Sequence, residues 1–478
     1  MRENRHKRRW SGGLCAAMVL PILAGCAGNR EKEPIRINIW TYYNGDQLIA
    51  FNELVEEFNA TVGAEKGIFV TNSSVGDINE LTANVQDSVA SKVGSEELPN
   101  VFSSYADTAY QMMQKGVVAN LAPYVTEEEY AAYVDSYIEE GDLTGDGSLY
   151  IFPVAKSTEV FLLNKTDWQV FAQETGATYD DFSTIEGLTA TAQRYYEWTD
   201  SLTAEPNDGK AFFGRDAMAN YFHVGFMQLG QELFTRNETG MTLQFDKGIA
   251  RKLWDNYYVP FVKGYFSASG RFRSDDIKTG NILAYVGSSS SAKFFPQEIL
   301  QDDMSSHTIE MEALPAPCFE QGQPYAIQQG AGMVVTSKAE EEVTASVEFL
   351  KWFTQEAQNI HFSVESGYLP VTKAANDLET IYTYETDVSE PVKKILDASI
   401  STVNKSEMYT SIPFERGERA REVLEYSMSD LAKADRAVVL EDLQRGMTLD
   451  EATEEFTSDA YFERWYQSMV QELSVWVE

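Results

Sequence analysis

Apolar residues recur with two different spacings between residues 35 and 120. In residues 35–40 nearly every second position is apolar, which is typical of a half-buried strand. In residues 48–58 the apolar positions lie three or four apart, which indicates the buried face of a helix. The same criteria predict further strands at 67–71 and 99–103 and further helices at 78–93 and 108–115. Because strands and helices alternate, we expect an α/β fold with a parallel sheet covered by helices.

The N-terminus begins with a basic segment and continues with a short apolar one. Residues 1–9 hold five basic residues and one acidic residue, and residues 14–25 are mostly apolar. This layout is typical of a secretory signal, and the apolar segment is shorter than the roughly 20 residues that span a bilayer. It ends in Leu-Ala-Gly-Cys, which resembles the lipobox of bacterial lipoproteins. An ordinary signal cleaved near Ala27 is the alternative.

The lipobox resemblance implies a lipid anchor. We expect residues 1–25 to be a signal peptide, Cys26 to be lipidated, and residues 26–34 to form a polar tether. Such a protein is held at the outer face of the bacterial cell membrane although its chain does not cross it. We therefore predict an extracytoplasmic protein whose only contact with the membrane is the anchor.

Charge and cysteine content exclude several function classes. The formal charge is −36 and becomes −40 without residues 1–25, which carry five basic residues and one acidic residue. Such a surface repels phosphate backbones, so we expect no nucleic-acid partner. Beyond Cys26 the sequence holds only Cys318, which excludes an internal disulfide and a metal site built on cysteine pairs. We expect no cofactor and no metal.

A Lys–Ser pair in the stretch FPVAKSTEVFLLNKTDW (152–168) raises the question of catalysis. In an extended segment adjacent side chains point to opposite faces, so Lys156 and Ser157 are poorly placed for a catalytic dyad. Ser157 and Glu159 would share one face, which favours a polar wall at a binding cleft. The alternative is that these groups only close the end of a strand.

The sequence GSSSS (287–291) invites a second catalytic interpretation. It lacks the closing glycine of the G-x-S-x-G motif, and no triad partner is evident. The hydroxyls of Ser288 and Ser289 are suited to hydrogen-bonding a polyol, and a flexible surface turn is the alternative.

Several stretches together resemble the extracellular solute-binding lipoproteins of bacterial ABC importers, a group that includes maltose-, oligosaccharide- and glycerol-phosphate-binding proteins. The stretches that carry the resemblance are FNELVEEFNATVGAEKGIFV (51–70), LPNVFSSYADTAY (98–110), FPVAKSTEVFLLNKTDW (152–168), YVGSSSSAKFF (285–295), QQGAGMVVTSK (328–338), FLKWFT (349–354) and SGYLPV (366–371). Their order and spacing match over nearly the whole mature chain.

The resemblance implies the two-lobed periplasmic-binding-protein type II fold, with a ligand cleft between two discontinuous α/β lobes. We expect the first lobe to comprise residues 35–150 and 322–355, and the second to comprise residues 151–321 and 356–478. Closure of the lobes around a solute is the hinge motion of such proteins.

Candidate ligand-binding residues come from residue type, from position at strand ends and from the resemblance. Aromatic rings pack on the apolar faces of sugars, and hydroxyls bind sugar hydroxyls. The candidates are Trp40, Tyr42, Tyr43, Tyr105, Ser157, Glu159, Tyr221, Trp254, Ser288, Ser289, Gly332, Tyr368 and Arg421. Core packing is the commoner role for any one aromatic residue; the position of Trp40 and Tyr105 at strand ends strengthens their case.

Arg421 matches an arginine that grips phosphate in the glycerol-phosphate relatives, but we prefer the alternative that it forms a salt bridge with one of the nearby acidic residues. Ile78 and Ala106 stand where those relatives have a tyrosine and a glutamate. This difference argues against a glycerol phosphate ligand.

We therefore expect a monomeric, lipid-anchored receptor without enzymatic activity. It would capture a mono- or oligosaccharide and deliver it to the permease of an ABC transporter. A secreted serine hydrolase and a ligand sensor or adhesin on the same fold are the alternatives.

Overall fold

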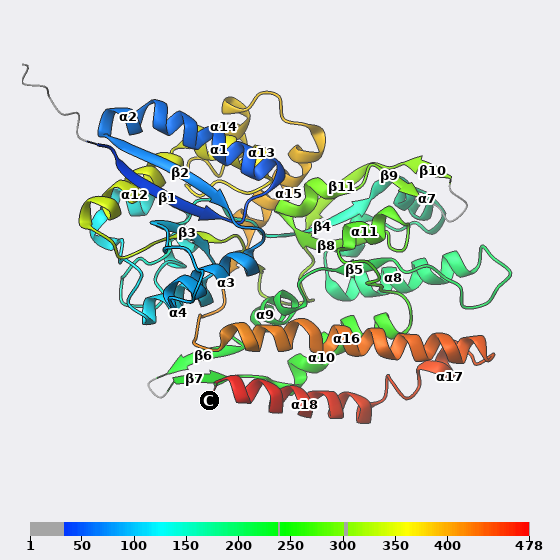
Figure 1. Cartoon of the computed structure of the whole chain (residues 1–478). Helices are drawn as coiled ribbons and strands as arrows, with labels where there is room; N and C mark the ends of the chain where they lie inside the picture. Colours follow the sequence, from blue (N-terminus) through cyan, green and yellow to red (C-terminus); the bar gives the residue numbers. More distant parts are fainter. Residues whose placement is uncertain (1–32, 238–239, 301–304, 478) are drawn as a thin grey trace, which may run out of the picture.

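The computed structural model describes residues 33–237, 240–300 and 305–477, which form two α/β lobes (Figure 1). Each lobe contains one four-stranded sheet. Within the described residues, no helix is long and apolar enough to cross a membrane. Cys26, the residue expected to be lipidated, lies outside the described residues.

The sheet of the first lobe has the strand order β13-β3-β1-β2. Its strands are β1 (Ile35–Thr41), β2 (Ile68–Ser74), β3 (Val101–Ser104) and β13 (Gly332–Val335). Strands β2 and β3 run parallel to β1, as the alternation of strands and helices predicts, whereas β13 returns late in the chain and pairs antiparallel with β3.

The helices of the first lobe cover its sheet and enclose an aromatic core. They are α1 (Gly45–Ala60), α2 (Val62–Lys66), α3 (Ile78–Val89), α4 (Ala106–Gln114), α5 (Glu127–Ala132), α6 (Asp135–Glu139), α12 (Glu340–Phe353) and α13 (Glu356–Ser366). Phe51 on α1 is fully buried and contacts the rings of Phe353 and Phe362. Residues 356–371, which the sequence analysis counted with the second lobe, pack here on α1 and the first core.

The sheet of the second lobe has the strand order β11-β4-β8-β5. Its strands are β4 (Glu159–Asn164), β5 (Phe213–Arg215), β8 (Ala284–Ser288) and β11 (Met311–Pro315). Strand β4 is antiparallel to both of its neighbours, and every one of its residues is buried.

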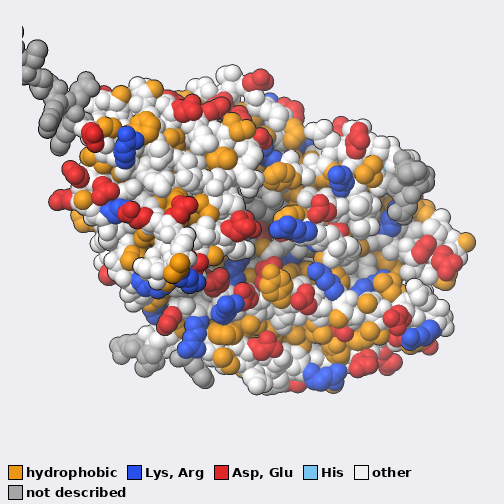
Figure 2. Space-filling model, viewed as in Figure 1, with side chains coloured by type: hydrophobic (Ala, Val, Ile, Leu, Met, Phe, Trp, Pro, Cys, Tyr) orange, Lys and Arg blue, Asp and Glu red, His pale blue; other side chains and the backbone are white. Residues whose placement is uncertain are grey.

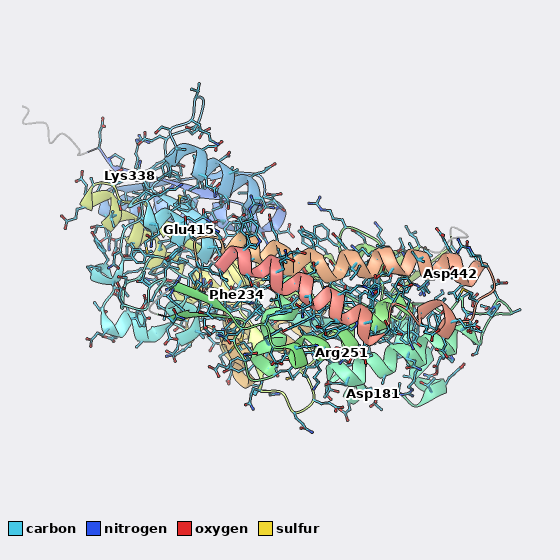
Figure 3. The ribbon with its side chains drawn as sticks, turned by 90° about the horizontal axis from the view of Figure 1, so that it is seen from below. Asp181, Phe234, Arg251, Lys338, Glu415 and Asp442 are labelled. Atoms are coloured by element: carbon cyan, nitrogen blue, oxygen red, sulfur yellow. The ribbon has the colours of Figure 1, made fainter. Side chains whose placement is uncertain are left out.

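Long helices cover the second sheet, and α16 and α18 lie side by side along one face of the lobe (Figure 3). The helices are α7 (Lys165–Thr175), α8 (Ile185–Asp200), α9 (Met218–Gln228), α10 (Lys247–Val262), α11 (Arg273–Lys278), α15 (Glu390–Lys405), α16 (Gly417–Gln444), α17 (Leu449–Thr453) and α18 (Asp459–Val477). The short 3-10 turns are η1 (Ala122–Tyr124), η2 (Tyr179–Phe182) and η3 (Ser289–Phe294).

The lobes are joined by segments that belong to neither sheet. The chain leaves the first lobe through residues 152–158, which make isolated bridges instead of continuing β4. It returns through β12 (Tyr325–Ile327), which pairs with β14 (Glu407–Tyr409), and passes again through α14 (Leu378–Tyr384) and α15. Two hairpins, β6 (Phe234–Asn237) with β7 (Gly240–Leu243) and β9 (Glu298–Leu300) with β10 (Ser306–Thr308), complete the fold.

Acidic residues, which outnumber basic ones in the sequence, are visible on one face of the molecule. On the face that Figure 2 shows, acidic side chains lie over both lobes and are interspersed with Lys and Arg. A surface of this kind favours solubility over the binding of polyanions.

The aromatic core predicts the cost of truncating Phe51. We expect Phe51→Ala to lower the free energy of unfolding by about 3–5 kcal/mol, because the cavity removes contacts with several rings. Urea denaturation followed by circular dichroism measures this change. The control is Ile49→Ala on the same helix, whose side chain is 58% exposed and whose loss should change stability by about 0.5 kcal/mol or less. Equal losses in the two variants would contradict this account of the core.

Candidate ligand-binding site

A pocket of about 270 Å³ lies between the two lobes. The first lobe contributes the starts of α3 and α4, and the second contributes α9, α16 and residues 410–411. The connecting segment 327–330 also lines it. Clefts between lobes are where small-molecule sites preferentially form, so this pocket is the candidate ligand site.

Asp107 and Gly417 bring the lobes into direct contact at the pocket. Asp107 lies in the first turn of α4, and Gly417 begins α16. A Cβ at Gly417 would come within 2.5 Å of Asp107 Oδ1, so a larger residue there would displace the Asp107 carboxylate from its present position. Burial raises the pKa of Asp107 to about 6, and Arg421 and the backbone N–H of Phe414 act in the opposite direction.

A series of hydrogen-bonded polar side chains orients Arg421. Glu159 forms a buried ion pair with Arg215 and accepts a hydrogen bond of 2.9 Å from Asn220 Nδ2. Asn220 Oδ1 in turn accepts a hydrogen bond of 2.8 Å from Arg421. Glu159 therefore orients Arg421 through Asn220, and both Asn220 and Arg421 line the pocket.

A second buried ion pair, between Lys156 and Glu140, positions the connecting segment 327–330 on the other side of the site. Lys156 is fully buried, pairs with Glu140, and donates a hydrogen bond of 2.9 Å to the Gly330 carbonyl. Gln328 Nε2 donates to Glu140 Oε2 at 2.8 Å and to the Ser136 carbonyl at 3.1 Å. These contacts determine the orientation of the Gln328 amide, because its nitrogen must face both acceptors.

Three buried polar atoms of the pocket lining have no hydrogen-bond partner within the described part of the chain. They are Gln328 Oε1, Gln329 Oε1 and Thr410 Oγ1. A buried polar group left without a partner costs about 1–3 kcal/mol, so most such groups in proteins are paired. Their gathering in one pocket indicates a site that a hydrogen-bonding molecule completes.

Tyrosines and serines from both lobes meet beside this pocket. The hydroxyls of Tyr42 and Tyr368 lie 2.9 Å apart, and burial raises the pKa of Tyr42, with further contributions from Tyr368 and Tyr105. Ser288 Oγ donates to Ser157 Oγ at 3.2 Å. The predicted site residues Tyr42 and Tyr368 thus form one pair and Ser157 and Ser288 another, and Tyr105, which lines the pocket, lies near the tyrosine pair.

Lys156 and Ser157 turn to different partners, as their adjacency in an extended segment predicts. Lys156 forms its bridge with Leu369, whereas Ser157 forms its bridge with Gln329. The Ser157 hydroxyl meets the hydroxyl of Ser288, and the Lys156 ammonium meets Glu140. This geometry does not place the lysine as a base for the serine.

Three predicted aromatic residues lie inside the cores. Trp254 stacks on Tyr258 with ring centroids 3.6 Å apart, and both rings are buried. Tyr221 is buried and donates its hydroxyl to the Leu253 carbonyl at 3.0 Å. Tyr43 packs in the first core beside Phe51 and Tyr368. None of these three rings lines the pocket between the lobes.

Ser289 and Gly332, which were also predicted to bind ligand, lie where backbone contacts and close packing account for them. Ser289 is fully buried, and its backbone N–H donates to the Thr158 carbonyl at 2.8 Å. Gly332 lies against Ile151 and Phe152, where a side chain would clash.

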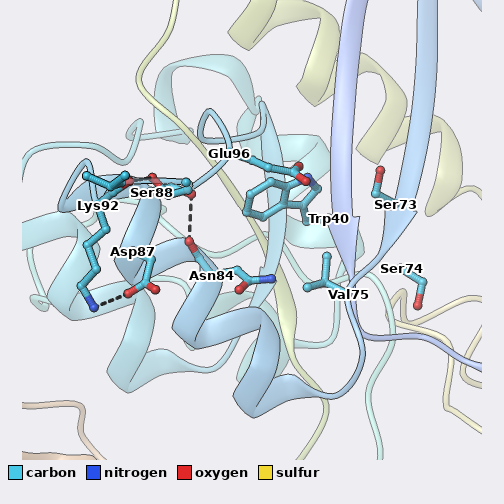
Figure 4. Close-up of a pocket in the computed structure, with 12 residues that line it drawn as sticks. Trp40, Ser73, Ser74, Val75, Asn84, Asp87, Ser88, Lys92 and Glu96 are labelled. Atoms are coloured by element: carbon cyan, nitrogen blue, oxygen red, sulfur yellow. Dashed lines mark hydrogen bonds and ion pairs between the residues drawn. The ribbon is translucent and has the colours of Figure 1, made fainter.

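Trp40 lines a different hollow, of about 520 Å³, which residues of α3 and of the ends of β1 and β2 surround (Figure 4). Its ring belongs to the hydrophobic cluster around Leu81 and Phe102 and is almost completely buried. The ring therefore offers little area on which a sugar could stack.

Sequence reasoning missed most of the polar lining of the pocket. The missed residues are Asp107, Glu140, Asn220, Gln328, Gln329 and Thr410. No motif or periodicity marks them, because they converge only when the lobes meet. Ile78 and Ala106, which differ from the residues of the glycerol-phosphate relatives, both line the pocket.

Comparison with solved structures identifies proteins of the same fold. The chain is similar to the cyclic alpha-maltosyl-1,6-maltose binding protein of Arthrobacter globiformis, with a TM-score of 0.66, 17% identity, and coverage of 92% of this chain and 99% of that one. UgpB of Mycobacterium tuberculosis, in complex with glycerophosphocholine, gives a TM-score of 0.63 and 19% identity, again covering 92% and 99%. The GacH receptor of Streptomyces glaucescens, solved unliganded and with acarbose, gives 0.62 and 16%, covering 91% and 98%.

Sequence comparison gives the family. No curated protein matches the chain. A family model described as bacterial extracellular solute-binding protein matches residues 53–388, well over half of the chain. The chain therefore belongs to the family of bacterial extracellular solute-binding proteins.

Proposed function

We propose that the protein captures a carbohydrate in the pocket between its lobes and delivers it to the permease of an ABC transporter. The observation that carries this proposal is the group of three unpartnered polar atoms in that pocket. Sugar hydroxyls both donate and accept hydrogen bonds, so one small sugar can satisfy all three. The solved structures of similar fold include proteins bound to oligosaccharides.

The pocket also offers the apolar contact that sugar recognition uses. The side chain of Tyr105 is 45% exposed at the pocket, so its ring can pack on the C–H face of a sugar. A volume of about 270 Å³ favours a small solute such as a mono- or disaccharide over a long chain.

Two contacts on separate elements support a closed arrangement of the lobes. Lys293 in η3 of the second lobe pairs with Asp46 of α1 at 3.0 Å. Arg236 on β6 donates to the Leu143 carbonyl at 3.2 Å and lies over the ring of Tyr110. We take residues 35–150 with 322–371 as the first lobe and infer that it closes on the remainder around the ligand.

Membership of an extracellular family supports a position outside the cytoplasm. We extend this to a lipid anchor at Cys26, with residues 26–34 as tether and the protein acting as a monomer. Transfer to a permease is inferred from the function of ABC importers and needs no covalent chemistry in the pocket.

A serine hydrolase is the alternative that the sequence raised. The described histidines do not approach Ser157. His307 pairs with Asp167 and His361 with Glu385, while His223 is buried beside Phe234 and burial lowers its pKa to about 3. This arrangement favours binding over catalysis. A sensor or adhesin would use the same pocket and differ only in its partner.

A thermal-shift screen tests the proposed function. We expect mono- or disaccharides to raise the melting temperature and peptides to leave it unchanged, because a ligand stabilises only the folded state that binds it. Gln329→Ala should weaken sugar binding about tenfold, which corresponds to the loss of one hydrogen bond. The control is Gln467→Ala on the exposed side of α18, which should bind as wild type. Stabilisation by peptides alone would contradict the proposal.

The contacts between lobes predict a separate effect on affinity. We expect Arg236→Ala and Lys293→Ala each to weaken sugar binding about threefold to tenfold, because each removes a contact that only the closed form makes. Isothermal titration calorimetry measures the affinities. Lys66→Ala is the matched control, because its partner Glu348 lies in the same lobe. If the three variants bound equally well, the contacts would not contribute to closure.

Asp107 predicts a pH dependence of stability. Its pKa of about 6 lies above the ordinary value of 3.8, so the folded state binds a proton between about pH 4 and pH 6 that the unfolded state does not. The charged carboxylate therefore lowers stability above pH 6, and this cost disappears as the pH falls toward 4. We expect Asp107→Asn to raise the free energy of unfolding by about 1–3 kcal/mol at pH 7 and by much less at pH 4.5.

Urea titrations at both pH values measure this difference. Asp430→Asn, on the exposed side of α16, is the control and should show no such pH-dependent gain. A gain of equal size at both pH values would show that burial of the Asp107 charge is not its cause.

A further inference from the structure

Acidic residues outnumber basic residues in the lining of the pocket. What we infer from this excess rests on the pocket being the sugar site proposed above. Of the described residues that line it, Asp107, Glu140 and Glu418 are acidic and Arg421 alone is basic. Behind the lining, Lys156 neutralises Glu140, and Arg215 neutralises Glu159. The remaining balance is two carboxylates against one guanidinium, so the pocket favours a cationic solute over an anionic one.

Arg421 is already engaged by groups of the protein. Its guanidinium donates to Asn220 Oδ1 at 2.8 Å and lies close enough to Asp107 to oppose the rise in the pKa of that carboxyl. A phosphate or carboxylate ligand would have to compete with Asp107 for this guanidinium. The pocket therefore disfavours acidic sugars.

The unpartnered atoms of the lining include acceptors. Gln328 is 6% exposed, and its amide nitrogen is held by Glu140 and the Ser136 carbonyl. Its oxygen Oε1 is therefore oriented as an acceptor without a partner in the described structure. An acceptor that lies beside a carboxylate and lacks a donor is well suited to an N–H group, above all to a protonated amine, which carries three donors.

An aromatic ring completes the environment of this acceptor. Tyr105 lines the same pocket. Loss of hydration raises the pKa of its hydroxyl, Arg421 lowers it, and the negative charge of Glu140 raises it further, so the side chains of Tyr105 and Glu140 are near one another. The faces of aromatic rings attract cations within about 6 Å of their centroids. Gln328, Glu140 and Tyr105 thus combine an acceptor without a partner, a carboxylate that already pairs with Lys156 but can accept a further hydrogen bond, and a ring.

We propose that the solute is an amino sugar, whose protonated amine donates to Gln328 Oε1 and Glu140 and whose hydroxyls bind the rest of the pocket. The negative balance from Asp107 and Glu418 attracts the amine, and the buried position of Gln328 selects for a donor. A neutral sugar of the same shape satisfies the hydroxyl partners but carries no positive charge to offset the excess of carboxylates in the pocket.

Three sugars that differ only at one carbon test the proposal. Glucosamine, glucose and N-acetylglucosamine carry an ammonium, a hydroxyl and an uncharged amide at the same position, and the disaccharides of the same series extend the test. We expect calorimetry at pH 7 to give glucosamine an affinity at least tenfold higher than the other two. This advantage should disappear when the pH is raised enough to deprotonate the amine.

Two variants separate the charge from the acceptor. Glu418→Gln removes a carboxylate at an exposed position and should reduce the preference for glucosamine over glucose several-fold. Gln328→Met should reduce it further by removing the acceptor, after circular dichroism has verified the fold. Glu422→Gln is the matched control, because Glu422 pairs with Arg419 on the same helix and is absent from the pocket lining.

The outcomes distinguish this inference from the function on which it rests. Equal binding of the three sugars, or tighter binding of glucose, would overturn the amino-sugar assignment while supporting a carbohydrate receptor. If peptides bound and no saccharide bound in either series, the proposed function itself would fall, and the assignment with it.

Discussion

A lysine without access to water stands where the chain first passes between the lobes. Lys156 is fully buried, and a buried ammonium is stable only when a charge partner and hydrogen bonds compensate for its lost hydration. Glu140 and the Gly330 carbonyl supply them, one from α6 and its end, the other from the returning segment. Because Glu140 also binds Gln328, this single requirement ties together the connection, the first lobe and one wall of the pocket.

The opposite wall follows the same principle with different residues. Glu159 begins β4, is buried, and is matched by Arg215 on β5 and by Asn220 on α9. Asn220 in turn accepts a hydrogen bond from Arg421 and so orients the guanidinium. Two buried ion pairs, one at each side, therefore orient neutral amides that reach the pocket. The charges stabilise the framework, and the amides line the pocket proposed as the ligand site.

The first sheet was predicted well because its signals are local. The alternating apolar positions of β1 and the one-sided apolar face of α1 depend only on neighbouring residues, and they are found where expected. Aromatic residues were interpreted less well. Trp254 and Tyr221 have the ring types that bind sugars, yet both are buried in the second core. An aromatic ring is stabilised by burial against any apolar surface, and a core offers more apolar surface than a cleft does.

The sequence by itself determined the α/β class, the likeness to solute-binding proteins, and the opposite orientation of Lys156 and Ser157. These follow from spacing along one segment or from the order of several segments. Only the tertiary structure decided which polar groups share the pocket. Asp107 and Gly417 are 310 positions apart in the chain, and Glu140 and Gln328 come from different passages of it. Their meeting depends on how two lobes dock, which is a property of packing over the whole chain and leaves no pattern in any one stretch.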